Sequence, residues 1–170
     1  MSANNPDAER VVVTTVIAVT PEIAFDAFSR DIDRWWKRTP RFRRAPGHTG
    51  TLLFEGDPPE RLVERNRDGT SLVGRVLAWE VGQRLVFEWS SADIGLEDKT
   101  RVEVRFAAHH KGTRVTLEHH GLGQLPAAHV ARRGLSGDAY SAMFGYFWAD
   151  LLTSLRVCLE TAAQLSSEAD

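Results

Sequence analysis

The sequence predicts an α+β fold in which one antiparallel β-sheet packs against a long C-terminal helix. Residues 51–121 contain short β-prone segments separated by turns, and residues 138–164 repeat apolar side chains at three- and four-residue steps. The apolar face of that helix is wide, and the sheet is the only predicted element large enough to bury it. The chain of 170 residues suits one domain, which we expect over residues 9–165, with flexible ends at 1–8 and 166–170.

The segment before the sheet predicts one strand and two short helices. Residues 10–19 are rich in β-branched side chains, which favour a strand. Thr20 is suited to cap a helix that begins at Pro21, because a hydroxyl can accept an orphan backbone N–H and proline is preorganised for the first turn. This helix is expected to end near Ser29, and a second short helix to begin at Asp31.

The turn at residues 111–112 sets the expected register of the last two strands. Counting outward from it pairs Val104 with His119 and places both on the apolar face of the sheet. The alternate positions, which include Glu103 and His120, fall on the solvated face. This alternation directs the side chain of His119 toward the helix.

The turn at residues 82–83 gives a similar count for the preceding strands. It pairs Ala78 with Phe87 and Val76 with Trp89. All four side chains are therefore expected on the inner face of the sheet.

Composition and charge exclude several classes of function. The 21 basic and 23 acidic residues give a formal net charge of −2, so no overall field attracts nucleic acid or anionic lipid. No apolar run approaches the ~20 residues that cross a bilayer, and the first ten residues are polar. We therefore expect a cytoplasmic protein with no membrane or nucleic-acid partner.

No pattern of side chains points to a metal, a cofactor or a nucleophile. The histidines at 109–110 and at 119–120 are neighbours in strands, and strand neighbours point to opposite faces. The single cysteine, Cys158, lies on the apolar stripe of the last helix, where a thiol is usually inert. We therefore expect no metal site, no cofactor and no catalytic residue.

Four segments of the chain resemble a known family in their order and spacing: 20–36, 74–89, 113–122 and 148–161. They are similar to the C-terminal-domain family of the activator of heat-shock-protein-90 ATPase, within the START-like (SRPBCC) superfamily. The resemblance implies the helix-grip fold, a curved antiparallel sheet wrapped around a long C-terminal helix, with two short helices after the first strand. Members of the family include co-chaperone domains and proteins that bind apolar or aromatic small molecules, and more distant relatives cyclise polyketides.

The resemblance and the inner face together predict a ligand pocket between the sheet and the helix. Small residues at Gly74, Val76 and Ala78 would leave room for it, although they would equally let the helix approach closely. His119 would hydrogen-bond the ligand, or it would be a core histidine satisfied by a backbone carbonyl. The candidate pocket residues are Trp36, Val76, Ala78, Phe87, Trp89, Val104, Phe106, His119, Phe144 and Trp148.

An arginine-rich segment follows the second predicted helix. It would form either a rim that attracts an acidic ligand or partner protein, or a solvated loop. Phe42, within this segment, could close over the pocket together with Trp36. Trp35 and Trp36 are adjacent on a helix, so one is expected in the core and the other nearer the pocket mouth, and spacing does not say which. The four arginines are Arg38, Arg41, Arg43 and Arg44.

These observations predict a binding module for an apolar or aromatic small molecule, without enzymatic activity. Two alternatives stay open: a protein-interaction domain like the co-chaperone members of the family, and a polyketide cyclase-like enzyme. An enzyme of that kind would need at least two inward polar groups, and the pattern offers only His119. The protein could be a monomer or a homodimer.

Overall fold

The computed structural model describes residues 10–39, 41–44 and 50–169. The predicted arm at 1–8 lies outside these residues. The helices and strands, in chain order, are β1 (Val11–Ile17), α1 (Pro21–Ser29), α2 (Ile32–Trp35), β2 (Thr51–Gly56), β3 (Pro59–Asn66), β4 (Gly69–Glu80), β5 (Arg84–Trp89), β6 (Thr100–His109), β7 (Gly112–His120) and α3 (Gly137–Glu168), with 3-10 turns η1 (Leu96–Asp98), η2 (Leu122–Gln124) and η3 (Val130–Arg132).

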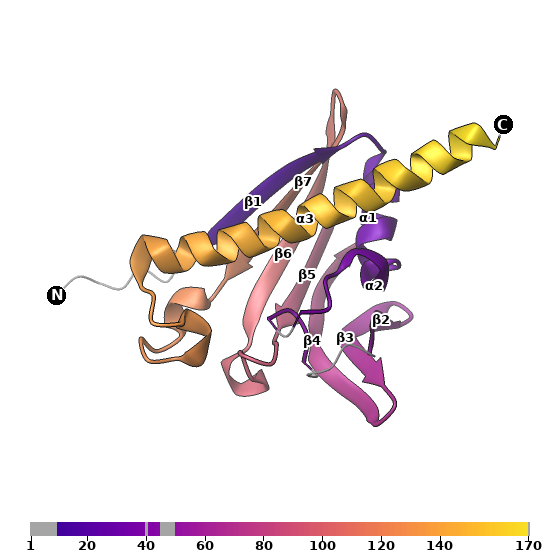
Figure 1. The fold of residues 1–170 in the computed structure, drawn as a ribbon. Helices are drawn as coiled ribbons and strands as arrows, with labels where there is room; N and C mark the ends of the chain where they lie inside the picture. The colour runs from indigo at the N-terminus through magenta and orange to yellow at the C-terminus, as the bar shows by residue number, and fades with distance from the viewer. Residues whose placement is uncertain (1–9, 40, 45–49, 170) are drawn as a thin grey trace.

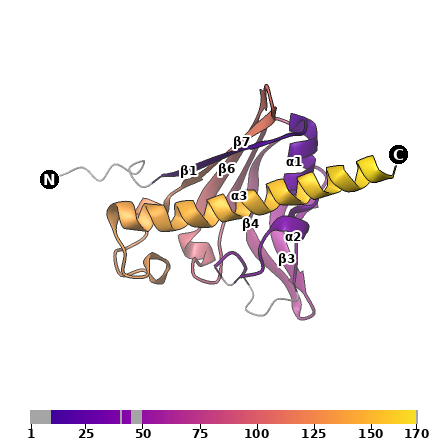
Figure 2. The same ribbon diagram turned by 45° about the horizontal axis from the view of Figure 1, so that its top comes forward.

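The seven strands form one antiparallel sheet in the order β1-β7-β6-β5-β4-β3-β2. The long helix α3 runs across one face of this curved sheet, and α1 and α2 lie beside its C-terminal half (Figures 1 and 2). The predicted helix-grip architecture is therefore confirmed. None of the helices within the described ranges has the length and hydropathy needed to cross a membrane.

The helices begin where the sequence predicts. The Thr20 hydroxyl accepts the backbone N–H of Ile23 at 3.4 Å, so this threonine caps α1. Asp31 immediately precedes α2. The helix α3 is longer than predicted, because it continues to Glu168.

One stripe of α3 packs against the sheet. Phe144, Trp148, Leu151 and Leu155 are all buried and belong to the main core. Cys158, on the same stripe, is half-buried and packs against that core. The three- and four-residue spacing in the sequence thus identified the buried face of the helix.

The register of β6 and β7 differs by two residues from the prediction. His119 pairs with Val102, not with Val104, because the turn consists of the residues before Gly112 and this glycine is already the first residue of β7. Gly112 has a φ of 126°, and a Cβ placed there would lie 2.2 Å from the carbonyl oxygen of Ile17. A shift of two keeps every side chain on its predicted face, so His119 points inward as expected.

The register of β4 and β5 contains a bulge that the alternation in the sequence could not show. Val76 pairs with Phe87, but Ala78 pairs with Val86, so one extra residue is inserted between them. Val86 pairs in turn with Glu103 on the convex face. The prediction that Ala78 faces the helix is therefore wrong, as are the predicted pairings of Ala78 with Phe87 and of Val76 with Trp89.

Trp79 takes the inner position that Ala78 was expected to hold. It pairs with Leu85 and packs against the core, with its ring 5.2 Å from Phe25 and 5.4 Å from Phe54. A large indole therefore occupies space that a small methyl side chain would have left open.

Gly74 allows two strands to approach closely and does not enlarge a cavity. A Cβ at this position would lie 1.7 Å from the carbonyl oxygen of Glu88 on β5. The glycine is therefore required by the contact between β4 and β5. This outcome favours the close-packing alternative for this position.

Candidate functional site

Aromatic side chains fill the centre of the space between the sheet and α3. Neighbouring rings in this group lie 5.5–6.3 Å apart, mostly edge to face. We call this group the aromatic cluster; its members are Trp36, Phe42, Trp89, Phe147 and Trp148. All ten predicted pocket residues except Ala78 lie in or against the core, but only Trp89 and Phe144 line the free space described below.

Trp35, the last residue of α2, and Trp36, the residue after it, are both buried, so neither lies at the open mouth of a pocket. Trp35 packs against Phe28, with ring centroids 4.9 Å apart, and donates to the carbonyl of Ala27. Trp36 instead packs against Trp148 in the aromatic cluster. The spacing did not show which tryptophan lies nearer the long helix; the contact with Trp148 of α3 shows that it is Trp36.

His119 sits in the core with both ring nitrogens occupied. The indole N–H of Trp148 donates to Nδ1 at 3.0 Å, and Nε2 lies 2.6 Å from the hydroxyl oxygen of Thr100. An indole N–H can only donate, so Nδ1 carries no proton and the neutral ring donates from Nε2 to Thr100. The Thr100 hydroxyl then donates to the carbonyl of Trp89 at 3.3 Å.

This network keeps His119 neutral. The side chain is fully buried, and burial, with a smaller contribution from His120, lowers the pKa of His119 to about 3. The core-histidine alternative therefore describes this arrangement, with Trp148 and Thr100 as partners in place of a backbone carbonyl. Neither nitrogen has capacity left for a ligand.

The free space lies at one end of the sandwich, beside the N-terminal half of α3. This end pocket is bounded by the loop after β5, by η3 and by the first turns of α3. Its free volume of about 10 Å³ has room for about one water molecule. Its apolar walls are Trp89, Ile94, Ala131, Met143, Phe144 and Phe147, and its polar residues are Arg41, Ser91, Asp93 and Arg133.

Among the tryptophans of the described chain, Trp89 is the one whose buried indole N–H has no hydrogen-bond partner. Trp35 and Trp36 donate to backbone carbonyls, and Trp148 donates to His119. A buried donor without a partner costs free energy, about 1–3 kcal/mol. Trp89 lines the end pocket, so the pocket has an unused donor in its wall.

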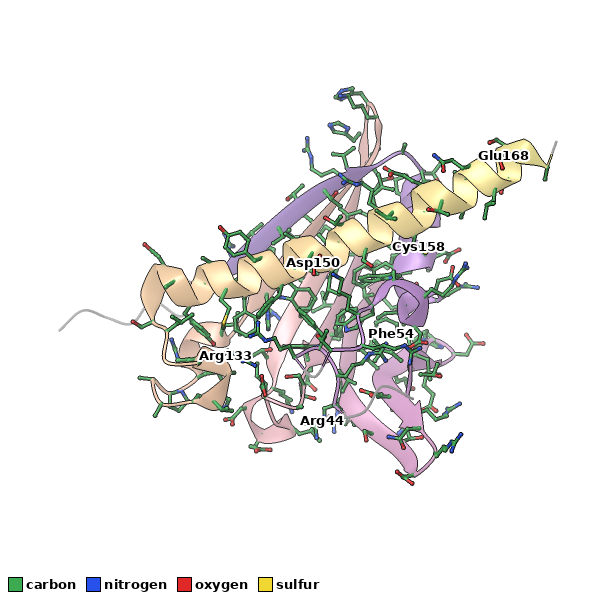
Figure 3. All side chains as sticks on the ribbon, viewed as in Figure 1. Arg44, Phe54, Arg133, Asp150, Cys158 and Glu168 are labelled. Carbon is green, nitrogen blue, oxygen red and sulfur yellow. The ribbon has the colours of Figure 1, made fainter. Side chains whose placement is uncertain are left out.

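Residues 41–44, which we call the cover segment, begin at the end pocket, where Arg41 is a lining residue. Phe42 inserts from this segment into the aromatic cluster, with its ring 5.7 Å from Trp148. Arg41 lies with its guanidinium carbon 4.2 Å from the ring centroid of Phe147. Figure 3 shows Arg133, another residue of the pocket, below the N-terminal part of α3. Phe42 is buried against two walls of the pocket, Trp89 and Phe147, but it is not itself a lining residue, so its closing over the pocket stays a prediction.

Buried hydrogen bonds tie the cover segment to the body of the protein. Arg43 is only 3% exposed, so the solvated-loop alternative is wrong for this residue. Its Nη2 donates to Asp33 at 2.9 Å, and its carbonyl accepts the backbone N–H of Ala92 at 2.8 Å. Asp33 also accepts the backbone N–H of Leu52 at 2.9 Å.

The carboxylate of Asp33 anchors this arrangement, and sequence reasoning missed it. Burial pushes its pKa up, but the hydrogen bond from Leu52 and the guanidinium of Arg43 outweigh that effect and hold the pKa below its usual value. Its partners come from β2 and the cover segment. An acidic residue on a short helix shows no sequence signal that would single out such partners.

Two further observations concern the rest of the described chain. No group of three or more His, Cys, Asp or Glu side chains in residues 10–39, 41–44 and 50–169 is arranged to hold a metal ion. A larger groove, of about 660 Å³, lies at the opposite end beside Phe54 and Trp79, but none of its lining residues has a buried polar atom without a partner. Of these two spaces among the described residues, the end pocket is the one that combines aromatic walls with an unused buried donor.

Known structures share this fold at low sequence identity. DynU16, from the dynemicin biosynthetic locus, is 18% identical with a TM-score of 0.58; the match covers 91% of this chain and 48% of DynU16, so the chain spans about half of that protein. MLL2253 from Mesorhizobium loti is 21% identical, with a TM-score of 0.53, over 89% of this chain and 97% of that protein. The Aha1 dimer from Colwellia psychrerythraea is 14% identical, with a TM-score of 0.53, over 86% and 92%.

Sequence comparison agrees with the structural comparison. A search of curated proteins finds no match to this chain. The family model described as Activator of Hsp90 ATPase homolog 1-like protein matches residues 18–160, which include every helix and strand from α1 to β7 and most of α3. The resemblance that the four sequence segments predicted is therefore confirmed, and the chain belongs to the Activator of Hsp90 ATPase homolog 1-like family.

Proposed function

We propose that this protein binds an apolar, ring-containing small molecule in the end pocket and releases it unchanged. The unpartnered, buried indole N–H of Trp89 is the observation that carries the proposal. Ligand pockets typically combine apolar walls with a few polar groups, and a ligand carbonyl or hydroxyl oxygen would satisfy this donor. The origin of DynU16 in a biosynthetic locus is a further point in favour of a small-molecule role.

Binding would require the cover segment to move. The closed pocket has room for about one water molecule, whereas a ligand ring needs at least the volume of a phenyl group. Phe42 contacts two walls of the end pocket, with its ring centroid 6.3 Å from Trp89 and 5.6 Å from Phe147, so its withdrawal would vacate a ring-sized space next to the pocket. The pocket and that space would then form one cavity lined by Trp89 and Phe147.

The direct test uses N-phenyl-1-naphthylamine, a neutral aromatic dye whose fluorescence rises in apolar surroundings. We expect saturable binding, with a shift of the Trp89 indole N–H signal in the ¹H–¹⁵N NMR spectrum. A Trp89→Phe variant assigns that signal. An absence of saturable binding would contradict the proposal, and so would binding that leaves the Trp89 signal in place.

Two variants change the size of the proposed cavity in opposite directions. Ala131→Leu fills the wall of the end pocket and should weaken dye binding, whereas Ala128→Leu, at an exposed position of the same loop, should not. Phe42→Ala removes the ring that occupies the cluster and should strengthen binding, at a cost in stability of about 3 kcal/mol. Melting temperatures of all variants show whether each is folded under the conditions of the titration.

A further inference from the structure

We infer that the ligand of the end pocket carries an acidic group, such as a carboxylate, held between Arg41 and Arg133. The inference rests on the function proposed above and specifies the chemistry of the ligand. The aromatic walls would contact its rings, and the two guanidinium groups would bind its negative charge.

The polar side of the end pocket has more positive than negative charge. Arg133 Nη2 lies 3.0 Å from Asp93 Oδ2, so Asp93 balances one of the two guanidinium groups. Arg41 stacks on the ring of Phe147, and no carboxylate of the described residues lies within ion-pair distance of it. The whole chain has a formal charge of −2, so this excess of positive charge is local.

The two arginines lie close enough to repel each other. The pKa of Arg41 is lowered, first by burial and then by the positive charge of Arg133, while Asp93 opposes the shift. An anion between the two guanidinium groups would replace this repulsion by two charge-assisted hydrogen bonds. A neutral ligand would leave the repulsion in place, and a cation would add to it.

Arg133 caps the end of η3 in a left-handed backbone conformation, and its side chain lies in the wall of the end pocket. Among the described residues it is the one non-glycine residue with a positive φ, at 52°. This conformation costs free energy for a residue with a Cβ, and such outliers cluster at ligand sites. Glycine would adopt it freely, yet the position holds an arginine that lines the pocket.

Near this site, the buried side-chain atoms of the described residues that have no partner are all nitrogens. The buried nitrogens without partners include the Trp89 indole and, in the cover segment, Nε of Arg43 and Nε of Arg44. A ligand with several acceptor oxygens fits such surroundings better than a hydrocarbon does.

A matched pair of dyes separates the charge from the rings. 1-Anilinonaphthalene-8-sulfonate has the ring system of N-phenyl-1-naphthylamine with one sulfonate added. Arg41→Met keeps an apolar side chain over Phe147 and removes the charge, and Arg133→Gly removes the charge and the backbone strain together. Arg156→Met, at a partly exposed position on α3 that does not line the pocket, is the control.

We expect each pocket variant to weaken binding of the sulfonate dye by about five- to ten-fold, because the guanidinium groups are partly screened by solvent. Binding of the neutral dye should change less than about two-fold, and the control should bind both dyes like the parent. Added salt should weaken only the sulfonate dye.

The outcomes distinguish the two proposals. If the neutral dye binds at Trp89 but the pocket variants bind the sulfonate dye as tightly as the parent, the ligand is not anionic and the inference fails alone. Equal losses for both dyes would also overturn it, because the arginines would then support the walls and not the charge. If neither dye binds the parent protein, the proposed function fails together with the inference.

Discussion

At the scale of single residues, His119 shows how packing decides what a polar side chain does. Its alternation with apolar neighbours on β7 turns it inward, and there Trp148 and Thr100 occupy both nitrogens. The same inward position that suggested a ligand contact therefore produces a structural hydrogen-bond network. Trp89 is the opposite case: it was predicted as an apolar wall, and its indole N–H is the polar group without a partner.

The buried neutral state of His119 predicts a pH-dependent stability. Its pKa is about 3 in the folded protein and 6.5 in an unfolded chain. Between these values the unfolded state binds a proton that the folded state does not, so the free energy of unfolding falls as the pH falls. The loss should reach about 2 kcal/mol between pH 7 and pH 5. His119→Gln does not titrate and should lack this part of the slope in urea denaturation.

The carboxylates contribute in a separate pH window. The pKa values of Asp33 and Glu103 are held below their usual range, since charged arginine partners outweigh the effect of burial. Their stabilising contributions are present above the ordinary carboxyl pKa and are lost only as the pH falls below about 4. A slope between pH 5 and pH 7 that is the same in His119→Gln and in the parent would contradict the assignment to His119.

At the scale of elements, β4 is the strand in which the side-chain directions depart most from simple alternation between the two faces of the sheet. Its bulge between Val76 and Ala78 turns Ala78 outward and Trp79 inward. Gly74 then lets the strand pass close to Glu88 on β5. Bulges and strand glycines of this kind bend a sheet, and together they account for curvature in this part of it.

Replacing glycine by alanine should have opposite effects on stability at Gly74 and at Gly145. Gly74→Ala would place a Cβ 1.7 Å from a backbone oxygen, so the strands must separate, and we expect a loss of about 2–3 kcal/mol in the free energy of unfolding. Gly145→Ala lies inside α3, where the nearest atom to its new Cβ, in Val11, is 4.0 Å away. It should stabilise the protein by about 0.5–1 kcal/mol. Denaturant midpoints of the two variants check both signs, and equal effects would show that the β4–β5 contact is looser than described.

At the scale of the whole molecule, the fold depends on the contact between α3 and the sheet. The helix crosses the strands diagonally, and its buried stripe contributes a large part of the core (Figure 1). The opposite face of the sheet is covered instead by charged side chains. There Glu103 accepts Arg84 at 2.8 Å and Arg105 at 2.6 Å. The two faces of one sheet thus have different roles, which the alternation along β6 and β7 already indicates.

This arrangement predicts how charges on α3 are tolerated. Leu155 is fully buried, so Leu155→Asp would place a carboxylate in the core and should cost several kcal/mol. Val157, two residues further along the same helix, is 52% exposed, and Val157→Asp should change stability by less than about 1 kcal/mol. Thermal melting compares them; similar melting temperatures would contradict the packing of α3 on the sheet.

Local and periodic signals in the sequence determined the order of the elements, the cap at Thr20, the buried stripe of α3 and the inward direction of His119. Each of these depends on residues close together in the chain or on a repeat of two or 3.6 residues, which short-range sterics and burial impose. The family resemblance also followed from short segments. These features could therefore be predicted without coordinates.

Only the tertiary structure decided what happens where distant segments meet. The bulge in β4 depends on contacts with two neighbouring strands, and it moved Ala78 to the other face. The partners of His119 and Asp33 come from elements far along the chain, so no spacing indicates them. The end pocket likewise exists because the cover segment, η3 and α3 converge there. Burial and hydrogen bonding between such segments depend on three-dimensional position, which periodicity along the chain does not encode.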